Sequence, residues 1–129
     1  MKDGLSGSIL DAIGNTPMLE VEGIYCKLEY LNPSGSIKAR IAKYMIERAE
    51  DEGLLRRGDT IVEATSGNTG NALSMVAAVK GYRMLVVMPE GMSGERVAIS
   101  RAFGDITGHP VVGGACAERD RTRQNNGQN

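Results

Sequence analysis

The chain has 129 residues, 41% of them hydrophobic and 24% charged, with no Trp and a single Phe. This length suits one compact domain whose core is built from aliphatic side chains and Met. A formal net charge of -1 argues against nucleic acid or an anionic membrane as a partner, and no apolar run has the length of a membrane span or the form of a signal sequence. Two Cys residues are too few for a disulfide framework, and neither lies in a metal-binding spacing. We therefore predict a cytoplasmic protein without a metal site.

The first third of the chain is predicted to form short elements separated by turns. Residues 5–15 have the pattern of a short amphipathic helix, and a Gly-Asn-Thr-Pro turn ends it. Residues 18–21 and 24–30 favour two strands, and the Glu-Gly pair between them predicts a tight hairpin. Within the second strand, Cys26 is expected to be a small buried hydrophobe.

Residues 36–53 form the first long predicted helix. At about 100° per residue, apolar side chains from Ile37 to Ala49 fall on one side of it, while Arg40 and other charged residues fall on the opposite side. Lys38 breaks this pattern. The same arithmetic places it in the middle of the apolar face, which is expected to be buried.

The middle of the chain alternates strands with helices. Strands are predicted over 60–64 and 83–88, and helices over 68–79 and 93–104. The helix over 68–79 is apolar on almost every side and is expected to be buried, and the continuous apolar run of the second strand predicts cover on both of its faces. This order predicts an α/β fold with a small parallel sheet, right-handed crossovers and flanking helices.

The C-terminal segment differs in character. Residues 105–129 carry scattered Gly and polar residues, and the part from residue 118 onward contains no strongly apolar side chain. We therefore divide the chain into an α/β segment over 1–104 and a divergent tail over 105–129, which is expected to be disordered.

Lys38 is the first candidate for chemistry. A lysine near a helix start can extend its ammonium to solvent and have no further role. On an apolar helix face and close to the positive helix N-terminus, however, the charged form is disfavoured, and a neutral amine is a nucleophile that reacts with carbonyl groups. Both roles remain open from the residues alone.

The second candidate is the loop from Thr65 to Gly70, which joins the end of a predicted strand to the start of a predicted helix. It has the composition of an ordinary capped turn, but it also offers backbone N–H groups, two Gly residues and short polar side chains at the positive end of a helix. Such a loop can hold a carboxylate or a phosphate, and it lies where parallel sheets bind ligands. It matches neither the Walker loop nor the dinucleotide-binding motif.

Five short motifs follow one another along the chain. They are Ile-Gly-Asn-Thr-Pro at 13–17, Lys-Leu-Glu at 27–29, Asn-Pro-Ser-Gly-Ser-Ile-Lys-Ala-Arg at 32–40, Thr-Ser-Gly-Asn-Thr-Gly at 65–70 and Met-Pro-Glu-Gly-Met-Ser-Gly-Glu-Arg at 88–96. Together they resemble the cysteine synthase and cystathionine beta-synthase family, which belongs to the tryptophan-synthase-β-like, fold type II pyridoxal phosphate enzymes. The resemblance covers residues 9–104 and implies the N-terminal part of that fold, truncated.

The resemblance assigns roles to both candidate sites. Lys38 matches the catalytic lysine that binds pyridoxal phosphate covalently and later moves the α-proton of the substrate. Asn68 matches the asparagine that faces the phenolic oxygen of the cofactor. The loop that holds the substrate carboxylate is matched by Thr65, Ser66, Gly67, Asn68 and Thr69.

The implied activity is β-replacement in cysteine biosynthesis by a transferase or lyase. An activated serine such as O-acetylserine loses its leaving group, and sulfide takes its place to give cysteine, while pyridoxal phosphate acts as the electron sink. The resemblance further implies a homodimer for the complete enzyme. For this chain, apolar surface left exposed by the incomplete sheet predicts self-association.

Two departures from the family pattern stand out. Ala39 occupies the position after the lysine, where many members have Asp. The family's loop for the cofactor phosphate and its polar residue at the pyridine nitrogen have no counterpart in the sequence, so the chain is expected to be the front part of a longer enzyme and inactive by itself. The alternative hypothesis is a truncated, inactive remnant that acts at most as a small anion-binding or interaction domain.

Overall fold

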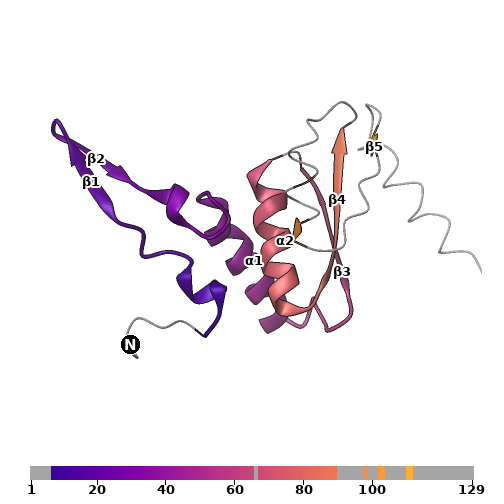
Figure 1. Ribbon diagram of the computed structural model, residues 1–129. Coiled ribbons are helices and arrows are strands. Elements are labelled where there is room, and N and C mark those ends of the chain that lie inside the picture. Colours follow the sequence, from indigo (N-terminus) through magenta and orange to yellow (C-terminus); the bar gives the residue numbers. More distant parts are fainter. Residues whose placement is uncertain (1–6, 66, 90–97, 99–101, 104–109, 112–129) are drawn as a thin grey trace, which may run out of the picture.

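Figure 1 shows the computed structural model, which describes residues 7–65, 67–89, 98, 102–103 and 110–111. Its elements in chain order are the short helix η1 (Ile9–Ala12), strands β1 (Met18–Val21) and β2 (Ile24–Lys27), the short helix η2 (Glu29–Leu31), helix α1 (Lys38–Asp51), strand β3 (Thr60–Ala64), helix α2 (Asn68–Lys80), and strands β4 (Arg83–Pro89) and β5 (Pro110–Val111). The predicted alternation of strand, helix and strand over residues 60–88 is confirmed, and α1 is two residues shorter at each end than predicted.

The body of the fold has three layers: a layer of parallel strands, α2 on one face of these strands, and α1 on the outer side of α2 (Figure 1). β3 and β4 pair in parallel, with Ile61 opposite Met84 and Ala64 opposite Val87, and β5 pairs with the other edge of β4. α2 connects β3 to β4 and packs against both strands, while α1 packs on α2. The α/β fold with a small parallel sheet is therefore confirmed.

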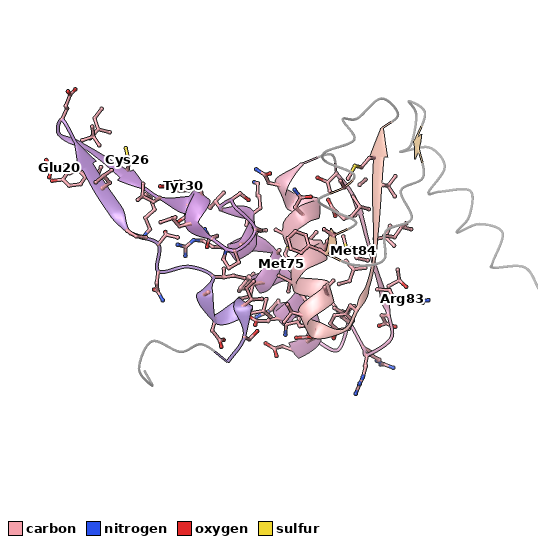
Figure 2. All side chains as sticks on the ribbon, viewed as in Figure 1. Glu20, Cys26, Tyr30, Met75, Arg83 and Met84 are labelled. Atoms are coloured by element: carbon pink, nitrogen blue, oxygen red, sulfur yellow. The ribbon has the colours of Figure 1, made fainter. Side chains whose placement is uncertain are left out.

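Helix α2 is buried on nearly all sides because it lies between α1 and the sheet. Every residue from Ala72 to Ala77 is buried, and Gly81 ends the helix in the left-handed conformation with φ of 78°. Met75 of α2 and Met84 of β4, both labelled in Figure 2, belong to the same core. The predicted burial of this helix is confirmed.

The prediction that the β4 strand is covered on both faces is correct for one face only. Met84 and Val86 are buried in the core shared with α2, whereas Leu85 and Val87 point to the opposite face and are half-buried. Val62 of β3, which pairs with Leu85, is 58% exposed. Among the described elements, α1 packs on α2 and not on the second face of the sheet, which explains this exposure.

The apolar face predicted for α1 is rotated away from the face that is buried. The buried residues are Ala39, Ala42 and Ile46, whereas Ile41 is 43% exposed and Met45 is 49% exposed. The prediction was wrong because it weighed hydrophobicity alone, whereas small Ala side chains let a neighbouring helix approach closely.

Strands β1 and β2 form the predicted hairpin, which extends away from the body (Figure 1). Glu22 and Gly23 both have positive φ, 49° and 81°, as a two-residue type I′ turn requires. Two predictions fail in this region. The second strand ends at Lys27, not at Tyr30, because the chain turns into η2. Cys26 is exposed, not buried, because all eight residues of this two-stranded sheet are exposed.

The remaining predicted elements have mixed outcomes. The helix predicted over 5–15 is a single 3-10 turn, η1, with a capping box between Ser8 and Asp11. Strand β5 was not predicted, since its residues fall in the segment expected to be disordered. The helix predicted over 93–104 and most of the tail lie outside the described residues. None of the helices in the described part is long and apolar enough to cross a membrane.

The Ser74 hydroxyl is an unsatisfied polar group in the core. The residue is 1% exposed, and its Oγ has no hydrogen-bond partner in the part of the chain that the structure describes. Because an unsatisfied buried hydroxyl is unfavourable, we expect Ser74→Ala to raise the free energy of unfolding by about 1 kcal/mol in urea denaturation. Val86→Ala, which removes buried methyl groups, should lower it by about 2 kcal/mol in the same assay. A loss of stability in Ser74→Ala would contradict the prediction.

Candidate functional site

The starts of α1 and α2 lie at the same end of the helix pair. The helices pack together, and near their C-terminal ends Lys80 Nζ is 2.7 Å from Glu50 Oε2, while the Tyr82 hydroxyl donates to Glu50 Oε1 at 2.8 Å. Counting back twelve residues from each member of this ion pair reaches Lys38 on α1 and Asn68 on α2, which is about 18 Å along either axis. The helices therefore run in the same direction and bring both predicted site segments to one end.

The contacts at the C-terminal ends of α1 and α2 also shift the pKa values of Glu50 and Tyr82. The hydrogen bond from Lys80 lowers the pKa of Glu50, and the bond from Tyr82 acts in the same direction. The same contact with Glu50 raises the pKa of the Tyr82 hydroxyl. Lys80 also lies in the last turn of α2, where a cation is favoured by the helix dipole.

Lys38 is the first residue of α1 and is half-buried. It lies at the edge of the buried face and not in its middle, because that face is centred on Ala39, Ala42 and Ile46; this corrects the expectation from the sequence. Within the described ranges its Nζ has no hydrogen bond or ion pair. Other lysines do have partners: Lys27 Nζ donates to the Thr16 carbonyl, Lys43 Nζ to the Leu10 carbonyl, and Lys80 Nζ to Glu50.

The loop before α2 folds back onto its own helix. Gly67 is the N-cap residue, and its N–H donates to Thr65 Oγ1 at 3.4 Å. Gly67 has no side chain that could cap the first amides of α2, and the first turn carries no acidic residue. This turn therefore leaves the positive end of the helix dipole without a compensating charge of its own.

The two glycines of this loop have different surroundings. A Cβ added to Gly70 would lie 2.6 Å from Thr65 Cγ2 and 3.3 Å from Val86 Cγ1, whereas a Cβ added to Gly67 would meet nothing within 4 Å. Gly70 is therefore required for the close approach of the loop to the helix and the sheet. Gly67 borders open space at the helix start.

The other predicted substrate residues lie on the same loop with differing exposure. Asn68 is exposed, Thr65 and Thr69 are half-buried, and Ser66 lies outside the described residues. The structure therefore gathers the described members of this set at the start of α2, at the end of the helix pair where Lys38 begins α1.

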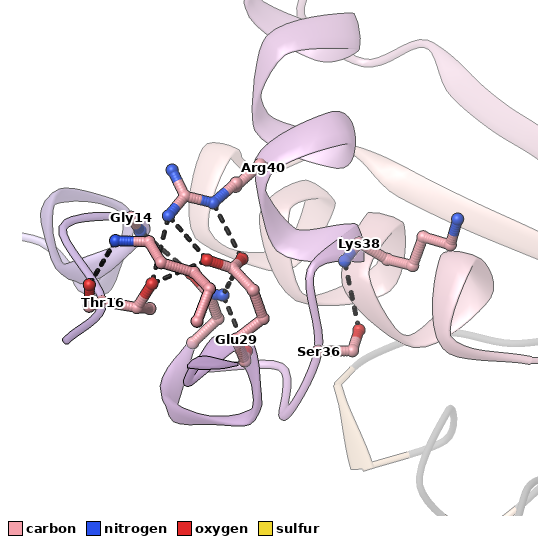
Figure 3. Close-up of polar contacts among 8 residues, drawn as sticks. Gly14, Thr16, Glu29, Ser36, Lys38 and Arg40 are labelled. Carbon is pink, nitrogen blue, oxygen red and sulfur yellow. Dashed lines mark hydrogen bonds and ion pairs between the residues drawn. The ribbon is translucent and has the colours of Figure 1, made fainter. Parts of the chain in front are cut away.

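A polar cluster holds the segment that precedes α1 (Figure 3). The Glu29 carboxylate accepts hydrogen bonds from Arg40 Nε at 2.8 Å, Arg40 Nη2 at 2.9 Å, Thr16 Oγ1 at 2.6 Å and Asn32 Nδ2 at 2.9 Å. The Asn32 side-chain oxygen in turn accepts the Gly14 N–H at 2.9 Å. The cluster joins residues from three of the sequence motifs, 13–17, 27–29 and 32–40.

The helix periodicity predicted that Arg40 lies on the solvent side of α1, and no role was predicted for the polar residues of this cluster. The Arg40 side chain is 39% exposed and that of Glu29 is 17% exposed, so the pair is partly shielded from water. Hydrogen bonds from Arg40, followed by that from Thr16, lower the pKa of Glu29 to about 2. The only signal in the sequence was that three of the motifs contained polar residues able to pair with one another: Thr16 in the first, Glu29 in the second, and Asn32 and Arg40 in the third.

Comparisons with known proteins place the chain in a family. A family model described as pyridoxal-phosphate dependent enzyme matches residues 9–125. The cysteine synthase of Flavobacterium sp. is 54% identical over 102 residues, covering 74% of this chain and 33% of that protein. The cystathionine beta-synthase of Apis mellifera is 51% identical over 106 residues, covering 74% of this chain and 21% of that protein. A hydrogen sulfide-producing enzyme from Fusobacterium nucleatum has a similar structure, with a TM-score of 0.83 and 44% identity, over 96% of this chain and 44% of that chain.

The chain belongs to the family of pyridoxal-phosphate dependent enzymes. Its similar relatives are cysteine synthases and cystathionine beta-synthases, and the resemblance noted from the motifs is confirmed. The chain spans one fifth to one third of the length of these two curated relatives. The family match also continues past residue 104, into the segment set apart above as a divergent tail.

The residues of the site fit the cofactor of this family, pyridoxal phosphate. Its aldehyde reacts with a primary amine, and the half-buried Lys38 Nζ is an amine without a partner among the described residues. Ser34 Oγ, in the loop before Lys38, is buried and has no partner in the described part of the chain, so it has free hydrogen-bonding capacity. The open start of α2 suits an anionic group.

The charge of Glu29 makes the stability of the cluster depend on pH. Its folded pKa of about 2 lies below the ordinary 4.5, so Glu29 contributes stability above about pH 4.5 that is lost as the pH falls through about 2. We expect Glu29→Gln to lower the thermal unfolding midpoint at neutral pH, and this difference from the unchanged chain should shrink as the pH is lowered towards 2. Glu52→Gln, in the exposed Arg48–Glu52 pair, should have little effect at any pH. If the difference in unfolding midpoint between Glu29→Gln and the unchanged chain did not vary with pH, the charged Glu29 carboxylate would not be the source of the stability.

The close approach at Gly70 predicts a difference between the two loop glycines. Gly70→Ala forces its Cβ against Thr65 and Val86, which should outweigh the gain in helix propensity and lower the free energy of unfolding by about 1 kcal/mol. Among the described residues other than its chain neighbours, a Cβ at position 67 meets no atom within 4 Å, so Gly67→Ala should change it by less than about 0.5 kcal/mol. Urea denaturation of both variants checks this, and equal midpoints would contradict it.

Proposed function

We propose that this chain supplies the reactive lysine and the substrate-carboxylate loop of a pyridoxal phosphate-dependent β-replacement site of the cysteine synthase type. The substrates of that reaction are an activated serine, such as O-acetylserine, and sulfide, and the product is cysteine. The observation that carries the proposal is the register of α1 and α2, which starts both helices at one end of the pair. One of these starts carries the Lys38 amine, which has no partner among the described residues. The cysteine synthase relative at 54% identity supports the choice of reaction.

In this proposal the loop at the start of α2 binds the amino-acid carboxylate. The carboxylate would accept hydrogen bonds from first-turn amides of α2, where the helix dipole favours a negative charge. The Thr65 and Thr69 hydroxyls and that of Ser66 are further donors, and Gly67 leaves room for the ligand. Asn68, which is exposed at the helix start, is the residue assigned to face the cofactor.

Lys38 has two tasks in this proposal. Its Nζ binds the cofactor and afterwards takes the α-proton of the substrate, which requires the amine to be neutral at that stage. When bound, pyridoxal phosphate supplies the electron sink that stabilises negative charge at the substrate α-carbon. The leaving group would depart from the β-carbon with its bonding electrons, and HS⁻ would form the new bond at the same carbon. Lys38 Nζ would then return the proton to the α-carbon, which completes cysteine.

The second candidate is a small anion-binding or interaction domain without catalysis. The hairpin favours it, because Met18, Ile24 and Tyr25 are 60%, 66% and 69% exposed and present apolar surface to solvent. Such a surface predicts self-association, which is compatible with either function. Binding of the cofactor through Lys38 discriminates between the two.

Mixing the purified chain with pyridoxal phosphate tests the proposal directly. We expect a visible absorbance band that Lys38→Ala abolishes, and borohydride reduction should leave the added mass on the peptide that contains residue 38. Lys43→Ala is the matched control, since Lys43 lies on the same helix with its Nζ bound to the Leu10 carbonyl, and it should keep the band. A chain that shows no Lys38-dependent band favours the second candidate.

A further inference from the structure

The residue proposed to react lies inside a chain segment that is closed by an ion pair at its two ends. Glu29 begins η2, Arg40 lies in the first turn of α1, and the two side chains meet through two parallel hydrogen bonds at 2.8 and 2.9 Å. Lys38 is the residue two positions before Arg40. The Glu29–Arg40 pair therefore closes a loop of eleven residue steps around the lysine.

The closing pair has support that an exposed ion pair lacks. Thr16 Oγ1 donates to Glu29 at 2.6 Å and also lies 3.3 Å from Arg40 Nη2, which donates to it. Asn32 Nδ2 donates to the same carboxylate at 2.9 Å. Because each charged group is held by several partners, the geometry of the pair is determined, in contrast to the exposed Arg48–Glu52 pair on the same helix, whose side chains are 60% and 44% exposed.

The start of α1 otherwise has weak local support. Its N-cap residue is Ile37, whose side chain offers no acceptor, and the first turn carries no acidic residue. The Lys38 N–H is bound by Ser36 Oγ at 3.2 Å, a neighbour in the same loop. The N–H groups of Ala39 and Arg40 bond to the carbonyls of Ser36 and Ile37 at 3.3 and 3.1 Å, so the first turn of α1 is held by the loop that precedes it. Movement of that loop would therefore change the direction of the Lys38 side chain.

Arg40 and Lys38 project to opposite sides of the helix start (Figure 3). The Glu29–Arg40 pair therefore does not touch the Lys38 ammonium, and any effect it has on the lysine is transmitted by the backbone of the first turn. These residues would be positioning residues and not catalytic ones.

We infer that Glu29 and Arg40, braced by Thr16 and Asn32, form a clamp that fixes the loop before α1 to the first turn of the helix and so holds Lys38 in the direction its chemistry needs. The inference deepens the proposed function and rests on it for the chemistry of Lys38. The clamp's action on the first turn of α1 is independent of any ligand and is measurable without one. Substitution of Glu29 or Arg40 leaves the Lys38 amine in the chain, but the Lys38 side chain is then no longer held in one direction.

The test is competitive acetylation of the cofactor-free chain with trace acetic anhydride, followed by peptide mass spectrometry. The readout is the acetylation of Lys38 relative to Lys80, which serves as the internal reference on α2. We expect Glu29→Gln and Arg40→Gln each to raise this ratio about threefold or more, because the loosened first turn exposes the amine, and the double variant should add nothing further. Arg40→Lys keeps the positive charge but cannot make the two parallel hydrogen bonds of the guanidinium, so the acetylation ratio should rise less than in Arg40→Gln.

The matched control is Arg48→Gln, which breaks the exposed ion pair of the same helix and should leave the ratio unchanged. Only variants that keep the helix content of the unchanged chain in circular dichroism are compared. If the Gln variants unfold, the acetylation ratio of Arg40→Lys, compared with that of Arg48→Gln, tests the inference. Ratios in the clamp variants equal to that of Arg48→Gln overturn the inference.

A second readout links the clamp to pyridoxal phosphate. The rate at which the Lys38-dependent absorbance band forms should fall about tenfold in Glu29→Gln, since misplacement of a reacting group slows its reaction steeply, and Arg40→Lys should restore part of what Arg40→Gln loses. If the unchanged chain forms no such band while acetylation still separates the clamp variants from Arg48→Gln, the proposed function fails and the clamp stands. If the band forms at the same rate in all variants, the clamp has no part in the chemistry and the inference fails.

Discussion

The parallel packing of α1 on α2 is the constraint on which the site depends. Lys80 and Tyr82 both bind Glu50 where the helices end, and this contact sets the register of one helix against the other. The small buried residues Ala39 and Ala42 belong to the core that α1 shares with α2, and their size permits a close approach. Without that register, Lys38 and the loop at residues 65–70 would be two unrelated helix starts.

The same requirement for close approach explains the residues that depart from simple patterns. Ala39 is completely buried, so a carboxylate at this position, which the family resemblance led us to expect, would lose its hydration in the core. Gly70 is buried in the first turn of α2 because a Cβ would meet the Thr65 side chain. In both positions the absence of side-chain bulk brings the elements of the site together.

The polar cluster and the hairpin show two uses of the N-terminal segment. Glu29 gathers Arg40, Thr16 and Asn32 into a partly shielded network, and its pKa of about 2 keeps the carboxylate charged below the ordinary pKa of 4.5 as well. The strands just before it form a hairpin with exposed apolar side chains on a small two-stranded sheet. The network joins the segment before Lys38 to α1, whereas the hairpin leaves apolar side chains exposed.

Local patterns in the sequence were sufficient for most of the elements and for the choice of candidate site residues. Glycine punctuation and apolar runs located β3, α2, β4 and the hairpin turn, and the motifs at 32–40 and 65–70 pointed to Lys38 and Asn68, because turns, caps and periodicity depend on neighbours along the chain. Only the tertiary structure decided which face of α1 is buried, that Cys26 is exposed, and that Glu29 pairs with Arg40. These outcomes depend on which segments meet in space, and hydrophobicity summed along one helix carries no record of the small residues that let another helix approach.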